Sequence, residues 1–157
     1  MNLHEYQGKS ILVKYGVPIQ NGYAADSVEE AMTKYDQLAT ETGSGFAVIK
    51  AQIHAGGRGK GGGVKLAKNR DEAPEHISNS LGRQLKTPQT PGGMEGPGKQ
   101  VNKILVAEDA YAPDFAACKE YYISILMDRA RKQNVIIHST QGGMDIEAVA
   151  EETPELV

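Results

Sequence analysis

The sequence predicts a fold of the α+β class, in which antiparallel strand pairs and helices are mixed along one chain. Three observations carry the prediction. Four segments place apolar residues at helical spacing, five or six short apolar runs lie between turn residues, and the 157 residues contain no internal repeat. Strands that follow one another after short turns favour antiparallel pairing, which is typical of this class.

The N-terminal segment predicts one helix and one extended stretch. The helix is expected over residues 2–15, because Asn2 can cap its start and Gly16 and Pro18 prevent its continuation. Residues 19–25 are short and mixed in character, so a strand or an extended link is expected there.

A second helix is expected to begin at Ser27. Glu30 stands three residues later, which is the capping-box arrangement, and Gly43 follows the last apolar position. The apolar residues at helical spacing between these ends are Ala31, Tyr35 and Leu38.

The middle of the chain predicts a hairpin followed by a helix. Residues 46–53 and 64–67 have the composition of two strands, and the glycine-rich segment 55–63 connects them. A helix is expected over 71–82, where Pro74 is tolerated because it falls in the first turn.

The second half predicts mostly strands. Residues 86–98 are rich in proline and glycine and are expected to form a surface loop, whereas 101–108 has the composition of a buried strand. The runs 119–128 and 134–140 are close enough to pair as antiparallel strands, and a helix is expected from Asp145 through Glu151.

Composition excludes several partners. The net charge of −3 provides no basic field for nucleic acid, and a chain with two phenylalanines and no tryptophan lacks stacking aromatics. No apolar run reaches membrane-spanning length, the first residues lack the plan of a secretory signal, and the single Cys118 suits a reducing compartment. We therefore expect a cytoplasmic protein (of the mitochondrial matrix in a eukaryote) with no nucleic-acid and no membrane partner.

The segment AGGRGKGGG at 55–63 is the first candidate site. Its glycines allow a close backbone approach to an anion, and Arg58 and Lys60 add positive charge. No Ser or Thr follows Lys60, and the segment leads into a strand instead of a helix, so it is neither a Walker A loop nor a dinucleotide fingerprint. The alternative is a solvated hairpin tip with incidental charges.

Lys50 is the second candidate. An ammonium within an apolar strand is costly unless its tip reaches an anion or solvent. Lys50 precedes the glycine-rich segment by a few residues, so both could converge on one phosphate chain, with Lys50 below and the loop as a cover. The alternative is that Lys50 extends to solvent along the face it shares with Val48 and Gln52.

Two glutamates and the histidines are the remaining candidates for ligand contacts. The strand end at Ala107 and Glu108 could offer backbone groups to a base, and Glu120 could accept hydrogen bonds from ribose, although both glutamates could equally be surface residues. His54 could contact phosphate or orient the hairpin. The histidines have no acidic or cysteine partners at metal-ligand spacing, so no metal site is predicted.

Three blocks of the sequence resemble one family. NLHEYQGKSILVKYGVP, VIKAQIHAGGRGKGGGVKLA and HSTQGGMDIEAVAEETPE are similar, in one register, to the β subunits of succinate–CoA ligases (succinyl-CoA synthetases). The resemblance implies an ATP-grasp fold, with a first subdomain over 1–107 and the beginning of a second over 108–157. It also implies that the chain is a fragment, inactive by itself, because members of the family are longer.

The resemblance also implies roles for individual residues. Lys50 contacts phosphate, and the Gly-Arg-Gly at 57–59 covers the phosphates. The residue of the linker between the two lobes that faces the base corresponds to Ala107 or Glu108. Glu120 contacts ribose and Gln20 falls where base specificity is set. The implied nucleotide-binding set is therefore Lys50, Gly57, Arg58, Gly59, Ala107, Glu108, Glu120 and Gln20, with neither a catalytic residue nor a metal ligand in this chain.

The implied reaction is the reversible synthesis of succinyl-CoA from succinate, CoA and ATP or GTP. The partner α subunit carries the phosphohistidine and the CoA site, and the Mg²⁺ ligands are expected beyond Val157. ATP versus GTP stays open, with ATP favoured. Two alternatives remain, a malate–CoA ligase β subunit and a nucleotide-binding module without catalytic activity.

Overall fold

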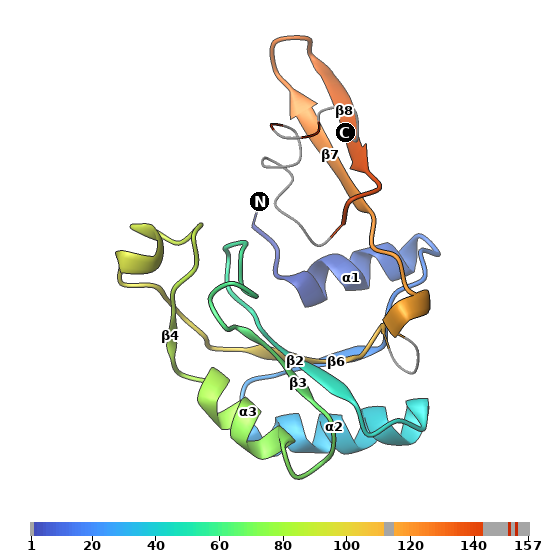
Figure 1. Ribbon diagram of the computed structural model, residues 1–157, viewed down its shortest axis with the longest axis vertical. Coiled ribbons are helices and arrows are strands. Elements are labelled where there is room, and N and C mark those ends of the chain that lie inside the picture. Colours follow the sequence, from blue (N-terminus) through green and yellow to red (C-terminus); the bar gives the residue numbers. More distant parts are fainter. Residues whose placement is uncertain (1, 112–114, 143–150, 152, 154–157) are drawn as a thin grey trace. The chain divides into compact units, whose positions relative to one another are not determined.

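The computed structural model describes residues 2–111, 115–142, 151 and 153 (Figure 1). The chain divides into two compact units, Met1–Ala112 and Pro113–Val157.

The first unit is built on a four-stranded sheet in the order β1-β6-β2-β3. All neighbouring strands are antiparallel. The strands are β1 (Gly22–Ala25), β2 (Ala47–Ala51), β3 (Val64–Ala67) and β6 (Ile104–Glu108). The last of them in sequence, β6, therefore lies between the first two, β1 and β2. The predicted hairpin of β2 and β3 and the predicted buried strand are confirmed, although β6 begins three residues later than expected.

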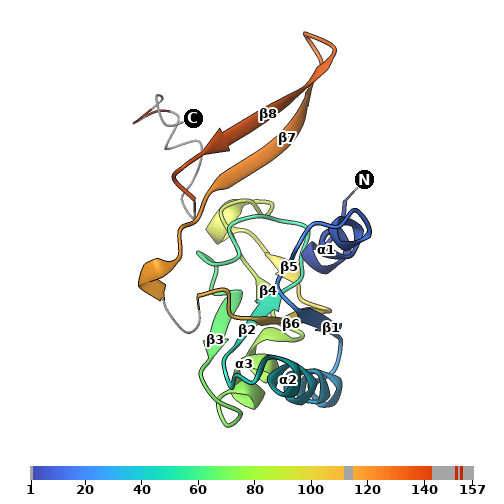
Figure 2. The same cartoon turned by 90° about the vertical axis from the view of Figure 1, so that its right-hand side faces the viewer.

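Helices cover both faces of this sheet (Figures 1 and 2). On one face lie α2 (Val28–Thr42) and α3 (Ala73–Ser80), and on the other lies α1 (Glu5–Lys14). The core forms between the sheet and the pair α2 and α3. Its largest fully buried side chains include Tyr35, Leu38, Ile49, Ile77, Leu85, Ile104 and Val106.

The ends of α2 follow the predicted signals. The Ser27 hydroxyl accepts a hydrogen bond from the Glu30 backbone amide at 3.2 Å. Gly43 ends the helix with a φ of 69°, a left-handed conformation that glycine adopts without strain. Pro74 lies in the first turn of α3, as predicted.

The start of α1 differs from the prediction. The cap is His4 and not Asn2, because the Gln7 side chain reaches back and accepts a hydrogen bond from the His4 amide at 2.9 Å. None of the residues of α1 is buried, and Leu12 and Tyr15 are 45% and 82% exposed. Packing in the core therefore does not hold α1 on the sheet.

Residues 86–98 form more structure than the predicted surface loop. Two short strands, β4 (Gln84–Leu85) and β5 (Lys99–Gln100), flank the segment and pair with each other. Within the segment, a 3-10 turn, η1, covers Gly93–Glu95. Thr87 is 0% and Thr90 4% exposed. The Thr90 hydroxyl donates to the Thr87 carbonyl at 2.8 Å and accepts from the Thr87 amide at 3.0 Å, so two polar residues are buried with their hydrogen bonds satisfied.

The second unit contains a hairpin of β7 (Tyr122–Asp128) and β8 (Gln133–Ser139), as predicted, preceded by a 3-10 turn, η2 (Phe115–Ala117). Large apolar side chains of both strands are exposed, including Ile123, Ile125, Met127 and Ile136. The helix predicted over 145–151 falls outside the described residues, apart from Glu151. Within the described part of the chain, no helix is long and apolar enough to cross a membrane.

Candidate functional site

Lys50 and Arg58 meet at one carboxylate, that of Glu5. Lys50 Nζ donates to Glu5 Oε1 at 2.9 Å, and Arg58 Nη2 donates to Glu5 Oε2 at 2.7 Å. The three side chains are between 18% and 25% exposed, so the cluster is largely shielded from water but still accessible. The two cations predicted from the sequence therefore converge on a single anion.

The strand β2 determines where Lys50 points. Successive residues of a strand face opposite sides of the sheet. Ile49 is fully buried in the core formed by α2 and α3, so Lys50 projects from the opposite face, on which α1 lies (Figure 1). Lys50 is opposite Val64 of β3 and Leu105 of β6, two apolar neighbours that fix its position in the middle of the sheet.

The conformation of the glycine-rich segment determines where Arg58 points. Arg58 Nη1 donates to the Ala51 carbonyl at 2.8 Å, and the Arg58 carbonyl accepts from the Gly63 amide at 2.7 Å. Gly57, with a φ of 69°, makes the turn that brings Arg58 back over the end of β2. The guanidinium is thus held between a strand carbonyl and Glu5.

The charges in the cluster shift the pKa values of Glu5 and Lys9. Burial alone would raise the pKa of Glu5, but the ion pairs and hydrogen bonds with Lys50 and Arg58 outweigh it and lower the pKa to about 2. Lys9 adds a third cation, with its Nζ 3.9 Å from Glu5 Oε1. Burial and the nearby Lys50 lower the pKa of Lys9, although Glu5 and Glu108 oppose this effect.

The glycine-rich segment is fixed in place by the residues around β4 and β5. Gln89 Oε1 accepts from the Gly56 amide at 3.0 Å, and Lys99 Nζ donates to the His54 carbonyl at 2.7 Å. Arg83 donates to the carbonyls of Gly61 and Gly62 at 3.0 and 3.3 Å. The alternative of a solvated tip with incidental charges does not agree with these contacts.

Gly57 and Gly59 differ in their surroundings. A side chain at Gly57 would contact Pro88, whereas the space around Gly59 is open to 4 Å. Gly59 is exposed and is therefore accessible to a ligand. The covering role expected of both residues stays a prediction.

Gln20 precedes Asn21 in the sequence, and Glu108 is hydrogen-bonded to Asn21. Gln20 Oε1 accepts a hydrogen bond from Lys9 Nζ at 2.8 Å, which links Gln20 to the cluster around Glu5. Glu108 Oε2 accepts from the Asn21 amide at 3.1 Å. Both candidates thus lie in the first unit, near the C-terminal end of β6. Their roles toward a base stay predictions.

Ala107 and Glu120 are placed differently. Ala107 is fully buried and pairs with Gly22 on one side and Val48 on the other, so its side chain is not available to a ligand. The contact predicted through its backbone groups stays a prediction. Glu120 lies in the second unit, where it is exposed and its carbonyl accepts from the Gly142 amide at 3.1 Å. Its predicted contact with ribose stays a prediction.

Glu5 was missed in the sequence. It lies 45 positions from Lys50 and 53 from Arg58, so no local spacing connects it with them. An acidic residue in a first helical turn also has an ordinary explanation, its favourable interaction with the helix dipole. His54 stacks on His4, the residue before α1, with ring centroids 4.0 Å apart. A contact of His54 with phosphate and an orienting role in the hairpin both stay predictions.

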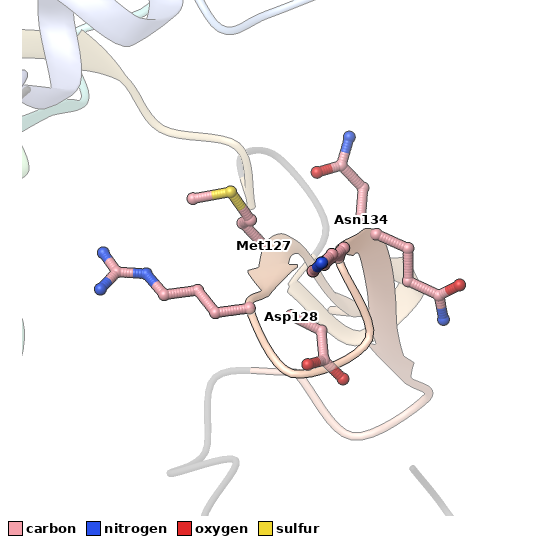
Figure 3. A pocket seen from close by; sticks show the side chains of 6 residues that line it. Met127, Asp128 and Asn134 are labelled. Atoms are coloured by element: carbon pink, nitrogen blue, oxygen red, sulfur yellow. The ribbon is translucent and has the colours of Figure 1, made fainter.

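Neither a metal-binding group nor the depression at the β7–β8 turn offers a second candidate site among the described residues. Among the described residues, no group of three His, Cys, Asp or Glu side chains could hold a metal ion. A depression of about 390 Å³ lies at the β7–β8 turn, where Met127, Asp128 and Asn134 point in different directions (Figure 3). The Asp128 carboxylate accepts hydrogen bonds from the amides of its own turn, Ala130 and Arg131, so its role there is structural.

Comparison with known proteins supports the resemblance noted in the sequence. A family model described as ATP-grasp domain matches residues 2–157. The chain is 56% identical to the succinate–CoA ligase [ADP-forming] subunit beta of Flavobacterium johnsoniae over 157 residues, and 54% identical to that of Chlorobium luteolum. Each alignment covers 100% of this chain and 38% of the relative, so the chain spans well under half the length of these relatives.

Solved structures of low sequence identity share the fold. A dinucleotide-forming acetyl-coenzyme A synthetase from Ca. Korarchaeum cryptofilum matches with a TM-score of 0.59 and 22% identity over 90% of this chain and 53% of that one. ATP citrate lyase from Methanothrix soehngenii matches with a TM-score of 0.60 and 21% identity over 92% of this chain and 33% of that one. The predicted α+β, ATP-grasp fold is confirmed.

Proposed function

Because the chain belongs to the ATP-grasp family, we propose that it is the part of a succinate–CoA ligase β subunit that holds the nucleotide phosphates. The names of the relatives support the choice of ligase. With an α subunit that carries the phosphohistidine and the CoA site, the whole protein would interconvert succinate, CoA and ATP with succinyl-CoA, ADP and phosphate.

The convergence of Lys50 and Arg58 on one carboxylate is the observation that carries the proposal. A carboxylate and a phosphoryl group both present oxygen acceptors that share a negative charge, and charge-assisted hydrogen bonds to either are short and strong. The two distances, 2.9 and 2.7 Å, are those of such bonds. The pair is therefore already arranged to grip an oxyanion from two sides.

The chain contributes positioning and charge to phosphoryl transfer. Lys50 would hold phosphate oxygens from the sheet and Arg58 from the glycine-rich segment, and the exposed Gly59 would cover them. Magnesium, when bound, would neutralise further phosphate charge. The side chains that converge here are cationic apart from Glu5, and such a set suits phosphate oxygens better than a metal cation, so we assign no magnesium ligand to them.

ADP and ATP are the proposed nucleotides. The names of the relatives, which are ADP-forming enzymes, support this choice. Gln20 accepts a hydrogen bond from Lys9 Nζ at 2.8 Å. An amide in that position can donate and accept toward either purine, so Gln20 is proposed as a contact to the base edge without deciding between adenine and guanine.

Calorimetric titration with ADP tests the phosphate grip. Lys50→Ala, made in the full-length protein that contains this chain, should weaken binding by about 1–3 kcal/mol through loss of a charge-assisted hydrogen bond. Lys65→Ala is the matched control, because Lys65 is an exposed lysine of the same sheet that lies opposite Ile49 in the register and so on the other face. Equal affinities of Lys50→Ala and wild type would overturn the proposal.

An assay of thioester formation tests the reaction itself. The full-length protein, prepared with its α subunit, should form a CoA thioester from succinate in the presence of ATP. If a thioester formed from malate and not from succinate, the phosphate-binding role of Lys50 and Arg58 would stand, and the proposed substrate would change to malate. Nucleotide binding with no thioester from either acid would favour a nucleotide-binding module.

A further inference from the structure

We propose that Glu5 is the internal counter-anion of the phosphate subsite, which holds Lys50 and Arg58 together when no nucleotide is bound and is displaced by a nucleotide phosphate. The inference rests on the proposed function of Lys50 and Arg58 and adds to it a residue of α1. Glu5 thereby becomes a positioning residue that also competes with the ligand.

The hydrogen bonds of the cluster show that Glu5 occupies the position an oxyanion would take. Each of its two oxygens accepts from a different cation, Lys50 at 2.9 Å and Arg58 at 2.7 Å. A phosphate oxygen that bound the same two donors at such distances would overlap the carboxylate. Binding of a phosphate by both cations therefore requires Glu5 to move.

Of the three side chains, Glu5 is the one whose support can give way. Lys50 lies in a central strand between β3 and β6, and Arg58 is also bonded to the Ala51 carbonyl at 2.8 Å. Helix α1, by contrast, has no buried residue. A further hydrogen bond joins α1 to the residue that follows β2, from the Tyr6 amide to Gln52 Oε1 at 3.3 Å.

The charge balance allows the exchange. Three cations, Lys9, Lys50 and Arg58, lie around Glu5, and Glu108 is a further acidic group that acts on Lys9. Positive charge therefore still exceeds negative charge in the cluster and attracts an incoming phosphate. Once the phosphate binds, it replaces the carboxylate as the partner of Lys50 and Arg58, and Lys9 remains beside Glu5. Neither cation is left without a partner at either stage.

The substitution Glu5→Gln tests the proposal, because glutamine has nearly the same shape and lacks the competing charge. Without ligand, the melting temperature should fall, since two cations lose their anion. ADP affinity should rise, on the order of tenfold, which corresponds to about 1.4 kcal/mol. A residue that only supports the fold would lower both quantities, so the opposite signs are the signature of competition.

Asp36→Asn is the matched control. Asp36 also forms an ion pair with an arginine, Arg70, at 2.7 Å, but this pair lies on the exposed side of α2. Its loss should leave ADP affinity unchanged. Titrations of Lys50→Ala run in parallel separate the two hypotheses: if Lys50→Ala weakens ADP binding and Glu5→Gln does not strengthen it, the counter-anion role is wrong and the phosphate grip stands.

Hydrogen exchange on the wild-type protein gives a second measurement that needs no variant. Displacement of Glu5 removes the ion pairs of α1 with Lys50 and Arg58, so amides of Glu5–Lys14 should exchange faster when ADP is added. Unchanged or slower exchange in α1, under conditions in which ADP is bound, would overturn the proposal even if Glu5→Gln does not fold.

Discussion

Gly61 lies directly against the backbone of Lys86, so that a Cβ at position 61 would overlap the Lys86 carbonyl oxygen. This close approach joins the glycine-rich segment to the β4–β5 hairpin. A similar approach occurs at Gly63, where a Cβ would overlap the Leu85 side chain. The glycines thus serve two purposes, close packing at some positions and access for a ligand at others.

Gly61→Ala should therefore destabilise the first unit. Overpacking against backbone forces the segment to shift, at a cost of about 1–3 kcal/mol, which urea denaturation measures. Gly59→Ala is the control, because the space around Gly59 is open and its φ is not positive. If Gly61→Ala were as stable as Gly59→Ala, the close approach would be incorrect.

The buried threonine pair predicts a loss of stability of a different kind. Thr90→Val keeps the shape of the side chain but removes the hydroxyl that bonds the Thr87 amide and carbonyl. The buried Thr87 amide then lacks a partner, which should cost about 1–3 kcal/mol in unfolding free energy. Thr40→Val is the control: Thr40 lies on the exposed side of α2, and its hydroxyl only donates to the Asp36 carbonyl. This substitution should cost far less unfolding free energy.

The pKa of Glu5 predicts a pH dependence of stability. Its value of about 2 lies below the ordinary 4.5, so the ionised side chain stabilises the folded state above pH 4.5, and this contribution disappears as the pH falls through 4.5 toward 2. Wild type should lose on the order of 2 kcal/mol relative to Glu5→Gln over that window, after allowance for solvent screening. Parallel curves for the two proteins in acid denaturation would contradict the ion pairs.

Two glycines with equally open surroundings should respond in opposite ways to alanine. Gly8 lies within α1 at an ordinary helical φ, so Gly8→Ala should stabilise the helix by about 0.5–1 kcal/mol. Gly43 has a φ of 69°, so Gly43→Ala should destabilise α2 by about 1 kcal/mol. Circular dichroism during thermal unfolding would reveal both changes, and the same sign for both would refute the conformational argument.

The sequence predicted elements whose signals are local. Ser27 and Gly43 bound α2 because a hydroxyl and a left-handed glycine act within one turn. The β2–β3 and β7–β8 hairpins followed from apolar runs on either side of a turn. The strands β4 and β5 were missed because two residues are too few to show alternation and because proline and glycine dominate the segment between them.

The candidate site was predicted in its cations and missed in its anion. Lys50 and Arg58 were conspicuous, one for its charge in an apolar strand and the other for its place among glycines. Glu5 became visible only when the chain was folded, because its partners are more than 40 positions away. The burial of Ala107 agrees with the buried strand predicted over 101–108, but the place of that strand between β1 and β2 is revealed by no local pattern.

The position of β6 also bears on how the protein folds during synthesis. Ile104–Glu108 is the last strand of the sheet to be made, yet it occupies a place between β1 and β2. Until the ribosome has released it, β1 has no partner in the sheet, β2 can pair only with β3, and Ile49 lacks its neighbour Val106. The sheet that presents Lys50 therefore closes late, through contacts of high sequence separation, and the slow step of folding should be the insertion of β6.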